Sequence, residues 1–112
     1  SLIPGSMLLI ENPEAHLHPN GQTEMGKLIA KATMAGVQVV VETHSDHLFD
    51  GIRIFTKEKP EFCNQFICYW FERDKYKFTT ASPVLINEKG KVTTSWPQGF
   101  FDQFETNAMQ LI

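Results

Sequence analysis

Short apolar runs and amphipathic segments alternate along the first half of the chain. Residues 7–10 form a continuous apolar run without polar alternation, which is typical of a strand buried on both faces of a parallel sheet. Over residues 21–35, apolar side chains recur at steps of three and four, which predicts a helix that ends at Gly36. A second β-branched run at 37–41 precedes another helical pattern at 46–55. The order strand, helix, strand, helix predicts a βαβ unit with parallel strands and a right-handed crossover.

Each predicted helix has one apolar face. The face of the first helix consists of Met25, Leu28, Ile29 and Ala32. The face of the second helix consists of Leu48, Ile52 and Phe55. Lys27 and Lys31 fall outside the first face, so we expect that face to be the buried side of its helix.

The second half of the chain is rich in aromatic and β-branched residues. The segments 62–73 and 75–80 flank a tight polar turn and predict a β-hairpin. Residues 84–87 and 92–95 flank a turn that contains Gly90 and predict a second hairpin. A C-terminal amphipathic helix is expected after Trp96-Pro97-Gln98-Gly99, with the apolar residues Phe100, Phe101, Phe104, Met109 and Leu111.

The predicted fold class is therefore α/β. It consists of a partial parallel sheet, a β-hairpin region and a C-terminal helix. At 112 residues the chain is long enough for one modest hydrophobic core and too short for two independent domains. Within it we expect two parts, residues 1–58 with the βαβ unit and residues 59–112 with the β-rich element and the last helix.

The composition points to a soluble protein. The net charge of −3 gives no sign of nucleic acid or an anionic membrane as a partner. No apolar run approaches the ~20 residues that cross a bilayer, so we expect no membrane partner. Cys63 and Cys68 have neither zinc-ribbon spacing nor the density of a disulfide scaffold, so we expect buried free thiols in a reducing compartment. These features together predict a cytoplasmic location.

Polar clusters follow both predicted strands, at residues 11–18 and 42–47. Because open α/β sheets place ligands beyond the carboxyl ends of their strands, we expect the clusters to lie side by side on one rim. An unpaired carboxylate near a low-dielectric core is costly, and a cation would compensate the charge of Glu11. Magnesium prefers such oxygen ligands. Glu14 and Asn12 are weaker candidates, because Asn-Pro is also ordinary turn chemistry.

The histidines allow a second interpretation. His16 and His18 alternate, while His44 and His47 are three residues apart, and zinc accepts imidazole ligands. Neither pair lies in the helical, glutamate-flanked framework that makes a zinc motif specific. A neutral imidazole at His44 would instead suit contact with a phosphate or a water.

Two segments together resemble the second half of an ATP-binding-cassette type ATPase. They are Leu8-Leu9-Ile10-Glu11-Asn12-Pro13-Glu14-Ala15-His16-Leu17-His18-Pro19 and Val39-Val40-Val41-Glu42-Thr43-His44-Ser45. More narrowly, they resemble the AAA-family ATPases grouped with the RecF, chromosome-maintenance (SMC) and overcoming-lysogenization-defect (OLD) proteins. In that family the first strand is the Walker B strand, a D-loop follows it, and the next strand ends in a switch histidine.

The resemblance implies roles for the acidic cluster. Glu11 matches the carboxylate that holds Mg²⁺, and Asn12 stands where the family usually has the glutamate that polarises the attacking water. Glu14 would then be a supporting carboxylate or the substitute base. The implied cofactors are Mg²⁺ and ATP.

The resemblance also implies roles for the two loops. Residues 15–18 match the D-loop, which with Pro19 would contact a second protomer in a homodimer. His44 matches the switch histidine that contacts the γ-phosphate. Ser45 and His18 are implied as further nucleotide contacts.

The tail extends the resemblance over most of the chain. Its sequence Trp96-Pro97-Gln98-Gly99-Phe100-Phe101-Asp102 resembles the ending of a bacterial subgroup that carries the DUF3696 domain.

Two departures from the family pattern matter. Asn12 is an amide and cannot accept a proton at neutral pH, so either Glu14 or Glu11 supplies the carboxylate or hydrolysis is slow. No G-x-x-x-x-G-K-[ST] sequence and no ABC-type signature sequence occurs in the chain. We therefore expect a C-terminal part of an ATPase, or the second half of a split one, that needs an N-terminal half to bind and hydrolyse ATP.

Two alternatives remain open at this point. The first is a pseudo-ATPase or nucleotide-gated interaction module, in which Asn12 marks lost hydrolysis. The second is a His-rich metallohydrolase. Members of the resembling family act with DNA or beside a nuclease, and either would be a partner of the complete system, although the chain itself has no nuclease cluster and no basic stripe.

Overall fold

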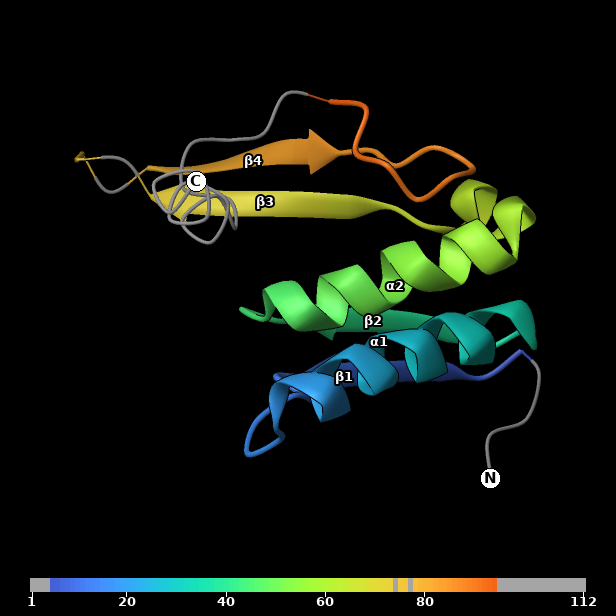
Figure 1. The fold of residues 1–112 in the computed structure, drawn as a ribbon. Coiled ribbons are helices and arrows are strands. Elements are labelled where there is room, and N and C mark those ends of the chain that lie inside the picture. The colour runs from blue at the N-terminus through green and yellow to red at the C-terminus, as the bar shows by residue number, and fades with distance from the viewer. Residues whose placement is uncertain (1–4, 74, 77, 95–112) are drawn as a thin grey trace, which may run out of the picture.

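The computed structural model describes residues 5–73, 75–76 and 78–94. In chain order its elements are β1 (Met7–Glu11), α1 (Pro19–Met34), β2 (Gln38–Glu42), α2 (Asp46–Glu58), the 3-10 helix η1 (Pro60–Gln65), β3 (Cys68–Arg73) and β4 (Thr79–Val84). Helix α2 lies between the β1–α1–β2 unit and the β3–β4 hairpin (Figure 1). The predicted α/β class, with a short parallel sheet and an antiparallel hairpin, is confirmed for this part of the chain.

Strands β1 and β2 pair in parallel, as the βαβ pattern predicts. Their register runs from Met7 opposite Gln38 to Glu11 opposite Glu42. Both strands lie within one residue of their predicted positions. The register brings the carboxyl ends of the two strands level with each other, which fixes where the two polar loops begin.

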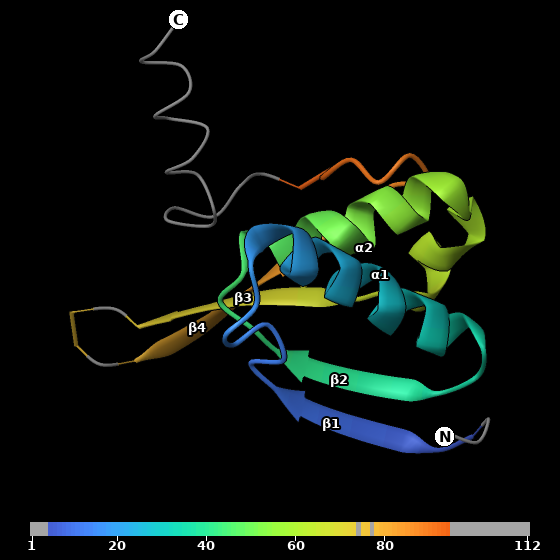
Figure 2. The same cartoon turned by 60° about the horizontal axis from the view of Figure 1, so that its bottom comes forward.

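Among the described residues, helices cover one face of the β1–β2 sheet and leave the other face open (Figure 2). Both α1 and α2 lie on the same side of it (Figure 2). Side chains that point to the other side are exposed, with relative accessibilities of 60% for Met7, 70% for Leu9 and 49% for Val40. The expectation of strands buried on both faces is wrong for the described residues, because no element among them packs against the second face.

Helix α1 begins two residues earlier than predicted. Its first residue is Pro19 rather than Gly21, and His18 before it has extended backbone angles. Proline suits the first helical position because its fixed φ matches the helix and its missing N–H would be unpaired there in any case. The proline is the signal that the apolar periodicity alone did not include.

Helix α1 ends where the sequence predicts, at Gly36. This glycine has φ +100°, and its N–H donates to the carbonyl of Thr33 at 3.0 Å. The N–H of Val37 donates to the carbonyl of Ala32 at 3.1 Å. The two bonds form a Schellman motif. This motif requires one residue with a left-handed backbone conformation, which glycine adopts without steric cost.

The buried face of α1 differs from the predicted one. Gly26, Ile29 and Ala30 are its buried residues, whereas Leu28 is 59% exposed. At about 100° per residue, Leu28 lies on the opposite side of the helix from Gly26. The prediction that Leu28 belongs to the buried face of α1 is therefore wrong.

Two glycines set the distance between α1 and α2. A Cβ added at Gly26 would overlap the carbonyl oxygen of Leu48, and one added at Gly51 would overlap the carbonyl oxygen of Thr23. In both places the neighbouring atom belongs to the backbone and cannot rotate away. The helices approach as closely as they do because neither crossing position has a side chain.

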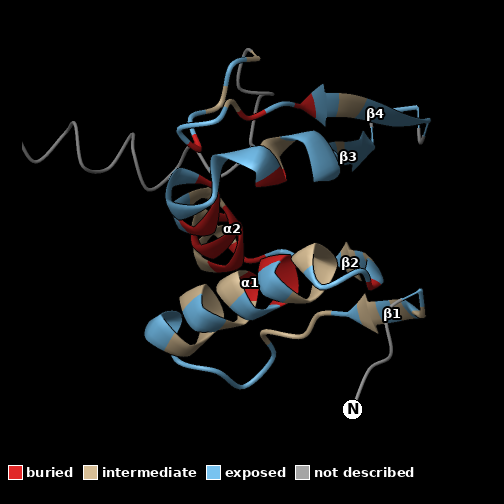
Figure 3. Ribbon diagram, turned by 90° about the vertical axis from the view of Figure 1, so that its right-hand side faces the viewer, coloured by how far each residue is buried: buried red, intermediate tan, exposed pale blue. Residues whose placement is uncertain are grey.

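The hydrophobic core is built around α2 (Figure 3). It joins the βαβ unit to the C-terminal half in one cluster. Its buried members are Ile29, Ala30, Leu48, Phe49, Ile52, Phe55, Phe62, Val84 and Ile86. All three predicted apolar positions of α2 are among them. The division at residues 58 and 59 stays a prediction, since this core is continuous across it.

The first predicted hairpin is confirmed in part. Strands β3 and β4 pair antiparallel, from Cys68 opposite Val84 to Arg73 opposite Thr79. Phe62, however, is in η1 and packs edge-to-face on Phe55 at 5.4 Å between ring centroids. Aromatic content made the segment resemble a strand, but its side chains fill the core from a 3-10 helix.

The second predicted hairpin is reduced to a turn and one bridge. Ile86 and Val92 form an isolated antiparallel bridge. Between them, the side chain of Asn87 accepts from the backbone N–H groups of Lys89 and Lys91 at 2.9 and 3.0 Å. The side chain of Asn87 thus stabilises the turn from within. The predicted C-terminal helix after residue 96 lies outside the described residues.

Both cysteines are free and only partly buried. The expectation of fully buried thiols is therefore too strong. Cys68 packs against the core, and burial raises the pKa of its thiol to about 11. In the part of the chain that is described, no helix is long and apolar enough to cross a membrane.

Candidate functional site

The loops after β1 and β2 lie side by side, as their positions in the sequence predict. The N–H of Asn12 donates to the carbonyl of Glu42 at 2.7 Å, which continues the strand pairing by one step. Further along, the Oε1 atom of Glu14 accepts from the backbone N–H of His44 at 3.3 Å. A side chain of the first loop thus contacts the backbone of the second at the position of the predicted switch histidine.

Two successive turns shape the loop after β1. The N–H of Ala15 donates to the carbonyl of Asn12 at 3.1 Å, and the N–H of Leu17 donates to the carbonyl of Glu14 at 3.0 Å. Asn12 and His16 have positive φ values of 48° and 69°. Asparagine tolerates this left-handed region better than most residues with a Cβ. The backbone therefore supplies a reason for an asparagine at position 12 that is independent of catalysis.

Comparison of two substitutions isolates this backbone effect. Asn12→Ala is expected to be about 1 kcal/mol less stable than Asn12→Gly, because alanine resists positive φ and glycine does not. Both variants lose the same side-chain amide, so the difference in the free energy of unfolding reports the backbone alone. Urea denaturation followed by circular dichroism measures it, and equal stability of the two variants would contradict the assignment.

Two oxygen atoms in this loop are buried without a hydrogen-bond partner in the described part of the chain. They are Oδ1 of Asn12 and Oε2 of Glu14. Buried polar atoms are almost always paired, so an unpaired pair of acceptors in one loop indicates a place for a cation, a water or a substrate group. The other oxygen of Glu14 is held by His44, which fixes the direction of the carboxylate.

Glu11 is exposed at the end of β1, and the sheet register places Glu42 directly opposite it. Partners in a parallel pair share a face, so both carboxylates lie on the uncovered side of the sheet with Leu9 and Val40. Like charges opposite each other are destabilising, and a cation between them would relieve the repulsion. Sequence reasoning did not single out Glu42, although the predicted strand pairing could have revealed it.

These oxygen ligands fit magnesium. Carboxylate and amide oxygens are the hard ligands that Mg²⁺ takes in proteins, usually one or two of them beside waters and phosphate oxygens. Glu11 can offer an exposed carboxylate, and Asn12 and Glu14, close to it in the sequence, each have an oxygen without a hydrogen-bond partner among the residues described.

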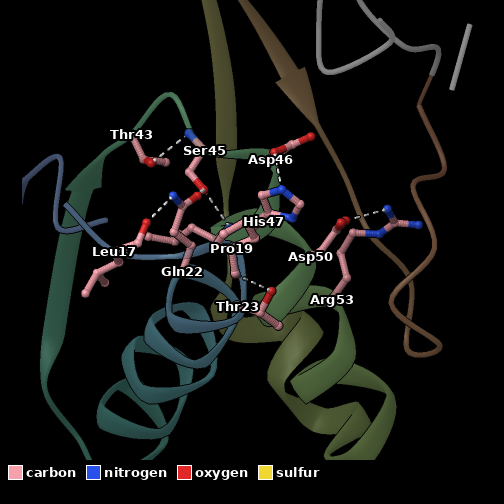
Figure 4. A network of polar contacts seen from close by, with 11 residues as sticks. Leu17, Pro19, Gln22, Thr23, Thr43, Ser45, Asp46, His47, Asp50 and Arg53 are labelled. Carbon is pink, nitrogen blue, oxygen red and sulfur yellow. Dashed lines mark hydrogen bonds and ion pairs between the residues drawn. The ribbon is translucent and has the colours of Figure 1, made fainter. Parts of the chain in front are cut away.

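A chain of side-chain hydrogen bonds joins the start of α1 to the start of α2 (Figure 4). The Oγ of Ser45 donates to Oε1 of Gln22 at 2.6 Å and accepts from the N–H of Leu48 at 2.9 Å. The Nε2 of Gln22 donates to the carbonyl of Leu17 at 3.0 Å. Ser45 is only 7% exposed and caps α2, so its hydroxyl is already used within the fold. Its nucleotide contact stays a prediction, and sequence reasoning missed Gln22.

The histidines do not gather. His16, His18 and His44 are exposed, and Nε2 of His47 lies 3.7 Å from Oδ1 of Asp46. Among the described residues, no three His, Cys, Asp or Glu side chains are close enough to hold a metal ion. Within the described ranges the zinc alternative thus finds no three clustered ligands, whereas a magnesium site completed by waters and phosphate oxygens does not need three.

An ion pair lies farther along α2. Burial raises the pKa of the Asp50 carboxyl, and Arg53, whose Nη1 lies 3.2 Å from Asp50 Oδ1, partly offsets this effect. The same guanidinium donates from Nε to the carbonyl of Gly90 at 2.9 Å. The pair thus anchors the turn after β4 to α2, and its contacts mark it as structural.

Comparison with known families adds an independent observation. Residues 4–49 match the AAA ATPase domain, and residues 63–111 match DUF3696, a protein family of unknown function. No curated protein and no solved structure matches the chain. The first match covers β1, α1, β2 and both polar loops, so an ATPase-like function is indicated for this part of the chain. The two matches together span most of the chain, which is therefore similar to AAA-type ATPases in its first part and to DUF3696 in its second.

Proposed function

We propose that this chain forms one wall of a Mg-ATP site in an ABC-like ATPase of the RecF, SMC and OLD type, and that the completed protein hydrolyses ATP between two protomers. The chain would supply the Walker B carboxylate, the D-loop and the switch histidine. The phosphate-cradling loop, absent from this sequence, would come from another polypeptide segment.

The observation that supports this proposal best is the contact between Glu14 and His44. It joins the two loops at the residues to which the family resemblance gives the chemistry. A structural role alone would not require the second oxygen of Glu14 to be buried without a partner. The match of residues 4–49 to an AAA ATPase domain independently supports an ATPase-like function.

In this proposal Glu11 would hold Mg²⁺, and Glu42 lies opposite it on the same face of the sheet. An ion held there would supply positive charge to offset the negative charge of the nucleotide phosphates. Glu14 is oriented by the N–H of His44 and takes the proton of the attacking water, since Asn12 cannot. His44, exposed beside it, donates to the γ-phosphate.

The uncovered face of the sheet supports the need for further elements. Met7, Leu9 and Val40 form an apolar strip that ends in Glu11 and Glu42. Burial of such side chains stabilises each by about 1.5–3 kcal/mol, so a segment that covers the strip gains binding energy. A segment bound there would lie next to the carboxylates. The N-terminal half of the ATPase is the occupant we propose.

Steady-state ATP hydrolysis by the complete protein tests the proposal. Glu11→Gln should lower turnover by at least about 100-fold, because the amide keeps the shape of the side chain but loses the charge that would hold the ion. Glu24→Gln is the matched control, since Glu24 is an exposed glutamate of α1 that forms a surface ion pair with Lys27 at 3.5 Å. Equal activity of the wild type and the Glu11→Gln variant would contradict the proposal that this site hydrolyses ATP.

A second candidate function is a pseudo-ATPase that uses nucleotide only to control assembly. The amide of Asn12 at the usual place of the base favours it. Under this alternative the wild type binds ATP but does not hydrolyse it. The protein would then be a cytoplasmic interaction module whose assembly is controlled by nucleotide binding. DNA or a nuclease would be a partner of the complete system under either proposal.

A further inference from the structure

Gln22 connects two loops that are far apart in the sequence. Its Nε2 donates to the carbonyl of Leu17 at 3.0 Å, and its Oε1 accepts from the hydroxyl of Ser45 at 2.6 Å. Leu17 belongs to the loop after β1, and Ser45 directly follows His44 in the loop after β2. One amide side chain therefore holds both loops, as the close-up in Figure 4 shows.

The chemistry of the partners fixes the orientation of this amide. The carbonyl of Leu17 can only accept, so the Gln22 amide must turn its NH₂ group toward it. Its oxygen is then left for Ser45. The hydroxyl of Ser45 has one proton, and it must point to Gln22 because its other contact is the N–H of Leu48, which is a donor. Each group thus has one way to satisfy the other.

The side chains of Gln22 and Glu14 both connect the loop after β1 to the loop after β2. Glu14 holds the backbone N–H of His44, and Gln22 holds the next residue, Ser45. Ser45 also accepts from the first turn of α2 and donates its own N–H to Thr43 Oγ1 at 3.0 Å. A shift of Leu17 would therefore be transmitted to both sides of His44.

We propose that Gln22 is a positioning residue that couples the protomer-contact segment, residues 15–19, to the γ-phosphate contact at His44. This inference rests on the proposed function, since it assigns a consequence to those two segments. Contact with the second protomer moves or fixes Leu17, and Gln22 passes this to Ser45 and so to His44. Hydrolysis then depends on a correctly formed dimer.

A double-mutant cycle in the complete protein tests the coupling. Gln22→Met keeps the length of the side chain and removes both hydrogen bonds. Turnover of ATP is measured for the wild type, Gln22→Met, His44→Ala and the double variant. We expect Gln22→Met to lower kcat about tenfold, a typical size for coupling between sites. We expect His44→Ala to lower it about 100-fold, and the double variant to equal His44→Ala alone within about twofold.

The matched control is Thr23→Val. Thr23 is the next residue of α1, and its hydroxyl donates to the carbonyl of Pro19 at 3.2 Å, a bond within the same helix end. The variant loses one local hydrogen bond without touching the loop after β2. Its kcat should stay within about twofold of the wild type.

Gln22→Glu serves as the second variant. Its carboxylate still accepts from Ser45 but cannot donate to Leu17, so it should lower kcat as Gln22→Met does. Wild-type turnover in Gln22→Glu would overturn the proposal, because it would show that the Leu17 contact transmits nothing. The proposal would also be overturned if the fold-losses in kcat of the two single variants multiplied in the double variant, because Gln22 would then act independently of His44. If the wild type is active and His44→Ala is impaired, these results overturn only the coupling; an inactive wild type overturns the proposed function as well.

Discussion

Gly26→Ala is expected to destabilise the protein by about 3 kcal/mol, the upper range for overpacking a tight contact. The new methyl group would overlap the carbonyl oxygen of Leu48, a backbone atom in the first turn of α2. Relief requires the two helices to move apart, and this opens the core around Leu48 and Ile52. The substitution would also move Ser45, which caps the same turn, so the loss of stability and the loss of the site should occur together.

Gly21→Ala in the same helix is the control for this prediction. A Cβ at Gly21 would meet only the side chain of Leu17 at 3.4 to 3.9 Å, which is ordinary contact. Because alanine favours the helix over glycine, this variant should gain about 0.5–1 kcal/mol. Urea denaturation of both variants measures the difference. If Gly26→Ala lowered the free energy of unfolding by less than ~1 kcal/mol, the two helices could not be as closely packed at Gly26 as the structure shows.

Glu14→Gln in the complete protein is expected to lower kcat by about 10²–10⁴, the usual contribution of a general base. The amide oxygen of the new side chain can still accept from the N–H of His44, so the loop keeps its position. What is lost is the ability to take a proton. ATP turnover under saturating ATP measures the effect, and turnover equal to the wild type would exclude Glu14 as the base.

Asn12→Glu distinguishes this mechanism from a pseudo-ATPase. If Glu14 is the base, an added carboxylate at position 12 should bring no gain in kcat. It would also place a glutamate at φ 48°, which costs about 1 kcal/mol. A large gain in turnover would instead show that hydrolysis was lost at Asn12.

The βαβ unit could be predicted from the sequence because its signals are local. The apolar runs of β1 and β2 and the periodicity of α1 and α2 each depend on neighbouring residues, and the structure places all four within one to three residues of the expected ends. Errors occurred where tertiary context decides. Leu28 has the right spacing for a buried face, but α1 packs on α2 through Gly26, on the opposite side of the helix, and Leu28 is exposed. Phe62 has β propensity, yet a 3-10 helix after Pro60 carries it into the core.

The site was predicted unevenly for the same reason. Strand order and parallel pairing, both readable from the sequence, predict the Glu11 and His44 clusters on one rim. The bonds that join them connect residues 30 and 23 positions apart, Glu14 with His44 and Ser45 with Gln22. No periodicity or spacing identifies such pairs. Gln22 in particular resembles any polar residue in the first turn of a helix.

Magnesium-dependent ATP turnover by the complete protein tests most directly whether this rim is one wall of a hydrolytic nucleotide site. The measurement compares the wild type with Glu11→Gln, at saturating ATP and with Glu24→Gln beside it. We predict turnover that requires Mg²⁺, a loss of at least about 100-fold in Glu11→Gln, and wild-type activity in Glu24→Gln. Turnover that is unchanged in Glu11→Gln, or no turnover by the wild type at all, would contradict the proposed function.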